Sequence, residues 1–170
     1  MSSGARLTAA RPLRTTTTGL LVLGVAGGLL SGCSDAVEVA PPPHVAACEP
    51  ATAKWPAQVA DQESRAVDVG GGEGSGEVIG RETDAQAWGD PAVIASCGWP
   101  ALGPTDKECL DVDGVYWVVE QLSDGVKFTT FGRDPAIQVL VPVAYQPEPL
   151  LLPAFGPAAK ALPTNGRTCE

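Results

Sequence analysis

The sequence predicts a small α+β domain: an antiparallel sheet of four or five strands with a short helix before it and another after it, stapled by two disulfides. Two observations support this fold class. Two Asp-Gly pairs, Asp113-Gly114 and Asp124-Gly125, separate short apolar segments, and Asp-Gly in that setting is a strong signal for a β-hairpin. Four cysteines follow Cys33, and an even number of cysteines in an exported chain is typical of disulfides.

The first 32 residues are typical of a secretory signal peptide. Three basic residues, Arg6, Arg11 and Arg14, precede an apolar run of 12 residues, Gly19–Leu30. A helix of that length spans about 18 Å, well short of the roughly 30 Å of hydrocarbon in a bilayer. We therefore expect residues 1–32 to be removed after export. A tilted helix that stays in the membrane is the alternative.

The residues that end this run resemble the lipobox of bacterial lipoproteins. Leu30-Ser31-Gly32-Cys33 contains an aliphatic residue, two small residues and then a cysteine. The resemblance implies cleavage before Cys33 and attachment of a diacylglycerol, with palmitate-like acyl chains, to its thiol. Each buried methylene contributes about 0.8 kcal/mol, so two or three acyl chains hold a protein on a membrane. We expect a protein anchored to the lipid bilayer on the extracytoplasmic face of the cell membrane. An ordinary signal peptide with an accidental cysteine is the alternative.

The charge of the chain argues against two classes of partner. The 170 residues include 11 basic and 20 acidic side chains, for a formal charge of −9. Removal of residues 1–32 takes away three arginines and no acid, which leaves 138 residues with a charge of −12. An acidic surface repels the phosphates of nucleic acids and anionic lipid head groups. We therefore expect no nucleic-acid partner and no second, polybasic membrane anchor.

Residues 33–47 are predicted to form an acylated N-terminus and a proline-rich tether. Pro41-Pro42-Pro43 favours an extended polyproline segment, which acts as a semi-rigid spacer. His44, the one histidine of the chain, lies in this spacer, where we expect it to contact solvent. A single globular domain is predicted for residues 48–170, because a chain of this length usually forms one domain.

The first part of the predicted domain contains a helix and a loop. Residues from Trp55 to Val67 are predicted to form a short helix, because Pro56 suits the first helical position. Residues 68–80 are rich in glycine, and we expect a flexible loop. This loop lacks the lysine of a phosphate-binding P-loop, and its Glu73 and Glu77 would repel a phosphate.

The second part of the domain is predicted to be the sheet. A short apolar run before Gly98 is typical of a buried strand, and alternating apolar segments flank both Asp-Gly pairs. The predicted strands are Ala92–Cys97, Glu108–Val112, Val115–Leu122, Val126–Phe131 and Ala136–Pro142. Prolines interrupt the last segment of the chain, so we expect only a short helix there, around Ala154–Leu162.

The four cysteines of the predicted domain are expected to form two disulfides. They are Cys48, Cys97, Cys109 and Cys169. Three pairings are possible from the sequence alone. Zinc is the alternative, but the chain has no C-x-x-C motif and its histidine is remote. A catalytic thiol would also lack a nearby base.

No pattern in the sequence indicates a catalytic residue, a cofactor or a bound metal, and we expect none. Asp111-x-Asp113-Gly114 is similar to part of a calcium loop, but the first ligand of such a loop is absent, and we expect a hairpin turn. Three hydroxyl residues, Ser123, Thr129 and Thr130, lie in or beside predicted strands. None has a histidine–acid pair to activate it as a nucleophile.

Short segments spread from Cys48 to about Leu162 carry a family resemblance. They are Cys48, Trp55-Pro56-x-x-Val59, Arg65, Ala87-Trp88-Gly89-Asp90-Pro91, Val93-Ile94, Ser96-Cys97-Gly98, Val112–Trp117 and Thr129–Arg133. These segments resemble the actinobacterial domain-of-unknown-function family numbered 3515, which consists of small secreted or lipid-anchored proteins. Ser96 replaces the basic residue usual in that family. The family's common cysteines match Cys48 and Cys97, so the resemblance implies that these two pair, which leaves Cys109 with Cys169. It implies no activity, because the family has none established.

The sequence therefore predicts a membrane-anchored lipoprotein that serves as a non-enzymatic interaction module of the cell envelope, with an envelope protein or glycan as its partner. The alternative is a small-molecule or glycan binding module that uses Trp88, Trp99, Trp117 or Tyr116 as stacking groups, although the tryptophans of a small domain usually pack in its core. A third hypothesis is a carboxylate-based envelope hydrolase, which needs two carboxylates about 5–10 Å apart in a groove.

Overall fold

A computed structural model of the chain describes residues 36–43, 47–70 and 84–169. All of them belong to one unit, Cys33–Glu170. The strands are β1 (Val37–Val39), β2 (Gln58–Val59), β3 (Gln62–Arg65), β4 (Val67–Val69), β5 (Ala85–Trp88), β6 (Val93–Trp99), β7 (Cys109–Val112), β8 (Val115–Gln121), β9 (Gly125–Phe131) and β10 (Ala136–Pro142). The helical segments are α1 (Glu49–Thr52), α2 (Gly156–Lys160) and the 3-10 helices η2 (Val143–Tyr145) and η3 (Glu148–Phe155).

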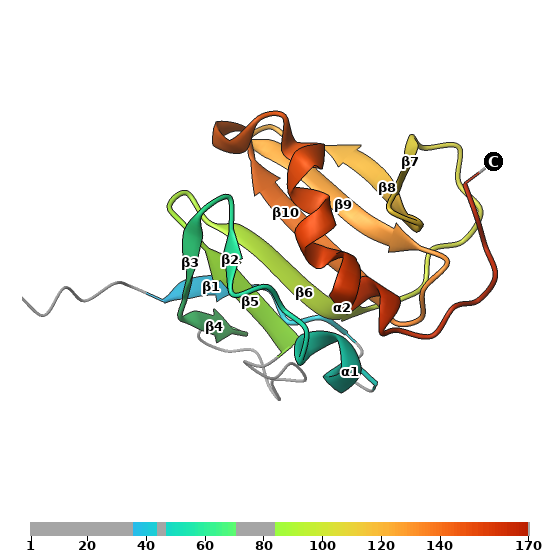
Figure 1. Ribbon diagram of the computed structural model, residues 1–170, viewed down its shortest axis with the longest axis horizontal. Coiled ribbons are helices and arrows are strands. Elements are labelled where there is room, and N and C mark those ends of the chain that lie inside the picture. Colours follow the sequence, from blue (N-terminus) through green and yellow to red (C-terminus); the bar gives the residue numbers. More distant parts are fainter. Residues whose placement is uncertain (1–35, 44–46, 71–83, 170) are drawn as a thin grey trace, which may run out of the picture. The chain divides into compact units, whose positions relative to one another are not determined.

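Eight strands form one sheet in the order β2-β3-β5-β6-β10-β9-β8-β7, and every neighbouring pair is antiparallel. The predicted α+β class with an antiparallel sheet is confirmed, but the predicted four or five strands are too few. β1 and β4 pair in parallel as a separate two-stranded sheet. In the large sheet β6 lies beside β10, so the consecutive strands β7, β8 and β9 all lie on the far side of β10 (Figure 1).

The strands predicted in the second half of the chain are confirmed as β6 to β10. At the first Asp-Gly pair, Asp113 and Gly114 have φ angles of 54° and 76°, as a two-residue hairpin turn requires. The second pair differs from the prediction, because neither Asp124 nor Gly125 has a positive φ. Gly125 is instead the first residue of β9. A Cβ atom there would lie 2.2 Å from the carbonyl oxygen of Val141, so the glycine allows β10 to approach closely.

The helix predicted from Trp55 to Val67 is wrong, because this stretch forms the strands β2 and β3 and the start of β4. Val59 pairs with Gln62, and the two residues between them, Ala60 and Asp61, have φ angles of 50° and 60°. This is the geometry of a tight hairpin. Only Val59 of the segment 58–64 is buried, so a helix here would have had almost no apolar face to pack.

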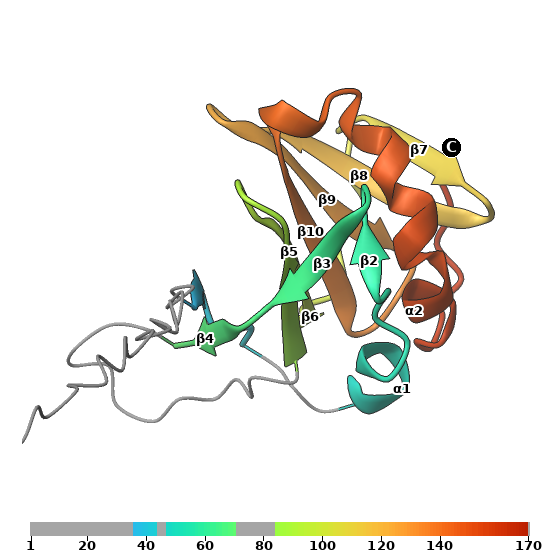
Figure 2. The same cartoon turned by 60° about the vertical axis from the view of Figure 1, so that its left-hand side comes forward.

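The helices predicted before and after the sheet are present, the first of them earlier in the chain than expected. α1 begins directly after Cys48, with Pro50 in its first turn, where proline is favoured. α2 lies inside the predicted range 154–162 and continues from η3. Figure 1 shows η3 and α2 crossing in front of β9 and β10, and Figure 2 shows α1 beside α2 from a second direction.

The main core lies between these helical segments and one face of the sheet. It contains fully buried aromatic side chains from both layers, such as Trp88 on β5 and Phe155 at the end of η3. Their rings meet edge to face with centroids 5.5 Å apart, a favoured aromatic arrangement. The indole nitrogen of Trp88 donates a hydrogen bond to the Pro56 carbonyl oxygen at 3.0 Å. The core prediction for Trp88 is confirmed.

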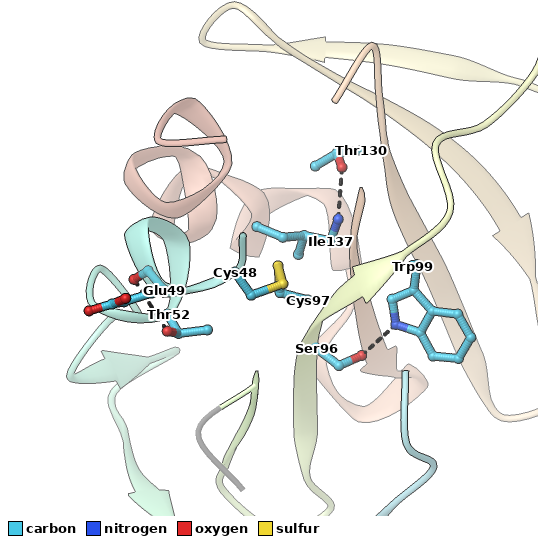
Figure 3. Close-up of a disulfide and its surroundings, with 8 residues drawn as sticks. All are labelled: Cys48, Glu49, Thr52, Ser96, Cys97, Trp99, Thr130 and Ile137. Atoms are coloured by element: carbon cyan, nitrogen blue, oxygen red, sulfur yellow. Dashed lines mark hydrogen bonds between the residues drawn. A yellow bond between two sulfur atoms is a disulfide. The ribbon is translucent and has the colours of Figure 1, made fainter. Parts of the chain in front are cut away.

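A disulfide between Cys48 and Cys97 joins α1 to β6 inside this core. Both cysteines have no exposed surface, and their Cα atoms are 5.9 Å apart. Figure 3 shows this bond between the short helix and the strand, with Ile137 of β10 beside it. The backbone N–H of Ile137 donates to the Thr130 hydroxyl at 2.9 Å, at the point where the register between β10 and β6 shifts. Thr130 therefore has a structural role.

Part of the predicted tether, residues 33–47, is paired with another strand of the domain. Val37–Val39 forms β1 and pairs with Val67–Val69 of β4, and the side chains of Val39, Val69 and Ala85 form a second small core. The alternation Val-Glu-Val is a strand pattern, and it places valines on the buried side. Residues 1–35, including Cys33, and residues 71–83, which hold most of the predicted glycine-rich loop, lie outside the described residues. Where the chain is described, it contains no helix of the length and hydrophobicity needed to cross a membrane.

Candidate functional site

The large sheet has one face in the core and one face opposite the helices. The second face contains a row of side chains that is less apolar than the core face. Val118 of β8, Thr129 of β9 and Gln138 of β10 are cross-strand neighbours in this row. Two segments without regular structure border the same region: residues 100–108, before β7, and residues 163–169, at the C-terminus. The C-terminal segment ends beside β7 (Figure 1). Cavities lie between these two segments and the sheet.

Three adjoining cavities form what we call the C-terminal cleft. The largest has a volume of about 430 Å³ and is lined by Pro104, Thr105, Lys107, Cys109, Phe131, Gly166, Arg167, Thr168 and Cys169. The second, of about 250 Å³, shares Thr105 and Lys107 with it and reaches Thr129 and Gln138. The third, of about 200 Å³, shares Arg167 and Thr168 with the largest. The shared lining residues show that the three cavities are neighbours.

The Cys109–Cys169 disulfide anchors the C-terminal segment to β7, with Cα atoms 5.8 Å apart. Both pairings implied by the family resemblance are therefore present in the structure. Cys109 lies opposite Val118 in the β7–β8 pairing, which places it on the cleft side of the sheet. Both cysteines of this bond are half-buried and line the largest cavity.

Backbone contacts hold the rest of the C-terminal segment. The N–H of Asn165 donates to the Gly132 carbonyl oxygen at 2.9 Å, and Arg133 and Thr164 form an antiparallel bridge. Gly132 has a φ of 77°, and a Cβ atom there would lie 2.3 Å from the carbonyl oxygen of Arg167. A side chain at residue 132 would therefore displace the segment from the end of β9.

Basic side chains gather around this cleft. Lys107, Lys127, Arg133 and Arg167 line its cavities, whereas Glu120 is the one acidic side chain among the lining residues that the structure describes. Glu120 forms ion pairs of 2.5 Å with both lysines. Hydrogen bonds from Lys107 and then Lys127 lower the pKa of Glu120 to about 2. The cleft thus has a basic lining in a chain whose net charge is −9.

The two arginines have no carboxylate partner in the described part of the chain. A guanidinium nitrogen of Arg133 donates to the Leu162 carbonyl oxygen at 2.9 Å, and one of Arg167 donates to the Leu102 carbonyl oxygen at 2.8 Å. Each guanidinium carries five N–H donors, so most donors of both groups remain for another partner. Arg133 and Arg167 line the same 200 Å³ cavity.

The aromatic residues predicted as stacking groups are divided between core and surface. Trp88 and Trp117 have no exposed surface, so neither can stack on a ligand. Trp99 is half-buried, and its indole nitrogen donates to the Ser96 hydroxyl at 2.8 Å (Figure 3). Tyr116 is half-buried and lines the 200 Å³ cavity. Of the four, only Trp99 and Tyr116 can reach a ligand.

The cysteines and Asp111, also considered from the sequence, have structural roles. All four cysteines of the domain are in disulfides, so their thiolates cannot bind zinc. A carboxylate oxygen of Asp111 accepts a hydrogen bond from the Gly114 N–H at 2.8 Å, so this residue closes the hairpin turn. Within the described residues, no cluster of three or more potential metal ligands occurs. Cys33, the predicted lipidation site, lies outside them.

Sequence reasoning missed the cleft because its basic residues come from distant parts of the chain. Lys107, Arg133 and Arg167 are far apart in the sequence, and only the fold brings them together. Comparisons of the chain with protein-family models, curated proteins and solved structures return no match. The resemblance to family 3515 therefore stays a prediction, and the argument for function depends on the residues themselves.

Proposed function

We propose that this protein is an exported, lipid-anchored module of the cell envelope that binds a partner without catalysing a reaction. Acylated Cys33 anchors the domain to the extracytoplasmic face of the cell membrane, and family 3515 is the group to which we assign it. The observation that carries the proposal is that the lipobox-like sequence before Cys33 precedes a domain whose four cysteines all form disulfides. Stable disulfides are typical of compartments outside the cytoplasm.

The distribution of side chains supports a binding role. Four basic and five hydroxyl side chains line the C-terminal cleft, and the one carboxylate among its described lining residues is paired with two lysines. A glycosidase-type reaction needs two carboxylates facing each other across a groove, and the lining of this cleft supplies only Glu120. Binding of a small molecule or glycan is the second candidate function, with Tyr116 as the one aromatic group of the cleft lining besides buried Phe131.

The lipid anchor is tested by expressing the full chain in a bacterium that processes lipoproteins. The membrane fraction is partitioned with a phase-separating detergent, and the N-terminal peptide is analysed by mass spectrometry. We expect the wild type in the detergent phase, with Cys33 as its first residue and the mass of the acyl groups added. Cys33→Ala should stay in the aqueous phase or keep its N-terminal segment, whereas Ser31→Ala, which preserves a small residue, should behave as wild type. An unmodified Cys33 in a chain that still begins at Met1 would contradict the proposal.

The binding role is tested by crosslinking in intact cells, followed by affinity capture and mass spectrometry. One envelope protein that is enriched with the wild type and lost with Cys33→Ala would support a membrane-positioned interaction module. An acylated protein without an enriched partner would contradict a protein partner and favour the small-molecule or glycan alternative.

A further inference from the structure

The most informative feature outside the predicted sites is the pair of arginines at the third cavity of the cleft. Arg133 follows the end of β9, and Arg167 belongs to the C-terminal segment that crosses it. Their side chains line one cavity of about 200 Å³ together with Tyr116, Thr164 and Thr168. Among the described residues, no acidic side chain lines this cavity, although acidic residues outnumber basic ones in the chain by 20 to 11.

Both guanidinium groups are held in place before any ligand binds. Each uses one nitrogen to donate to a backbone carbonyl oxygen, that of Leu162 for Arg133 and that of Leu102 for Arg167. These contacts restrict the side chains and leave further N–H donors on each group. A positioned guanidinium loses less conformational freedom on binding, which favours affinity. Planar N–H pairs of this kind match the oxygens of carboxylate and phosphate groups.

The neighbouring groups fit an anion as well. The hydroxyls of Tyr116 and Thr168 make no hydrogen bond within the described part of the chain and line the same cavity. Three glycines also line it, and at two of them, Gly114 and Gly166, the space beside the backbone is open, which permits close approach of a ligand. Among the described residues, the carboxylates nearest along the chain are those of Asp113 and Asp134, which are exposed and do not line the cavity.

We propose that the cavity between Arg133 and Arg167 binds the phosphate or carboxylate group of a small ligand, with the rest of the ligand in the adjoining 430 Å³ cavity. That larger space carries Lys107, Thr105 and Thr168, which suit a polar or hydroxylated ligand. The anionic group belongs either to a free small molecule or to a lipid head group, because both present the same oxygens. The inference does not depend on the lipid anchor and stands even if Cys33 is not acylated.

The test is a titration of the isotopically labelled full chain in a non-ionic detergent, followed by NMR. The probes are inorganic phosphate, glycerol 3-phosphate and acetate, with chloride at matched ionic strength as the control. We expect saturable shifts of the Gly132 and Gly166 amide signals with at least one oxyanion and none with chloride. Absence of saturable shifts with all three oxyanions would overturn the proposal.

Variants decide whether the two arginines form the site. Arg133→Gln and Arg167→Gln should each weaken binding by roughly 10-fold or more, the loss expected for charge-assisted hydrogen bonds. Arg167→Lys keeps the charge but loses the planar donor pair, so binding should weaken less. Lys160→Ala, an exposed cation on α2, is the matched control and should bind as wild type. An equal loss in Lys160→Ala would overturn the proposal, because it would show a general effect of charge.

Two further measurements keep the test decisive. Far-UV circular dichroism and the urea midpoint of each variant show whether it is folded. If Arg167→Gln is not folded, Arg167→Lys tests the site in its place. Micelles that contain dioctanoyl phosphatidylglycerol are then compared with micelles of dioctanoyl phosphatidylcholine. Arginine-dependent shifts with the anionic lipid would identify a lipid head group as the source, and shifts with glycerol 3-phosphate alone would identify a soluble ligand. Both results support the proposed oxyanion site.

Discussion

The two disulfides of this protein lie on opposite faces of one sheet and have different surroundings. Cys48–Cys97 has no exposed surface and packs among core side chains between α1 and β6. Cys109–Cys169 is half-buried and lines the largest cavity. The first bond joins two elements that the core already holds together. The second holds a segment without regular structure against the cleft. We infer that the buried bond maintains the fold, whereas the half-buried bond maintains the candidate site.

Removal of the buried disulfide should have the largest effect on the stability of the domain. Cys48→Ala combined with Cys97→Ala should lower the free energy of unfolding by roughly 4 kcal/mol, because the bond closes a loop across a sequence separation of 49 residues. The lost sulfur packing in the core adds to this effect. Urea denaturation followed by tryptophan fluorescence measures the change. A loss below about 1 kcal/mol would contradict the assignment of this bond to the stability of the fold.

The half-buried bond should contribute less to the stability of the domain and more to holding the C-terminal segment at the cleft. Its sequence separation of 60 residues gives a similar loop-closure contribution, but the freed C-terminal segment can fray while the rest of the domain stays folded. We expect Cys109→Ser combined with Cys169→Ser to lower the unfolding free energy by only about 2 kcal/mol. Hydrogen exchange should accelerate at Asn165 and not in β6.

Accessibility supplies a second comparison of the same two bonds. Thiol–disulfide exchange requires a thiolate to reach a sulfur atom, so a mild reductant should open the half-buried bond before the buried one. Timed alkylation and peptide mass spectrometry of the wild type follow the order of reduction. Reduction of Cys48–Cys97 first, or of both bonds together, would show that the burial of the bonds does not control their reactivity.

Gly132→Ala tests the cleft side of the comparison without breaking a disulfide. The new methyl group would meet the Arg167 carbonyl oxygen, and φ at this position is 77°, which costs about 1–2 kcal/mol for a residue with a Cβ atom. We expect a loss of that size in urea denaturation and weaker phosphate binding in the NMR titration. Gly156→Ala is the control, because Gly156 lies in α2 outside the cleft and a Cβ atom there has open space, so this variant should bind phosphate as wild type. Equal phosphate binding by both variants would mean that the C-terminal segment does not form the site.

The sequence predicts those parts of the fold that depend on neighbouring residues. Alternating valines and the Asp113-Gly114 turn predict β7 and β8, because side-chain alternation and turn geometry are local properties. The hairpin at Ala60 and Asp61 escapes prediction, because alanine rarely adopts a positive φ and only the docking of β3 on β5 favours this turn over a helix. The cleft escapes prediction as well, because Arg133 and Arg167 meet only after the C-terminal segment docks.

The smallest expected effect concerns residues 100–108, the other border of the cleft, which the Lys107–Glu120 ion pair joins to β8. Lys107 and Lys127 flank Glu120 and lower its pKa from 4.5 to about 2. A lowered pKa means that the folded state favours the carboxylate, so this stabilisation is complete above pH 4.5 and is lost as the pH falls toward 2. The groups are partly exposed, which limits the contribution to less than about 1 kcal/mol.

Glu120→Gln should therefore reduce stability slightly at pH 7 and have a much smaller effect at pH 2, where most of the stabilisation is already lost. Glu108→Gln is the matched control, because Glu108 is exposed and forms no ion pair within the described residues. Urea midpoints at both pH values, and at low and high salt, measure the difference, which should shrink as salt screens the charges. A loss from Glu120→Gln that persists at pH 2 would show that Glu120 acts through packing. Packing and not charge would then hold residues 100–108 in place, and in this respect the segment would resemble the buried surroundings of Cys48–Cys97.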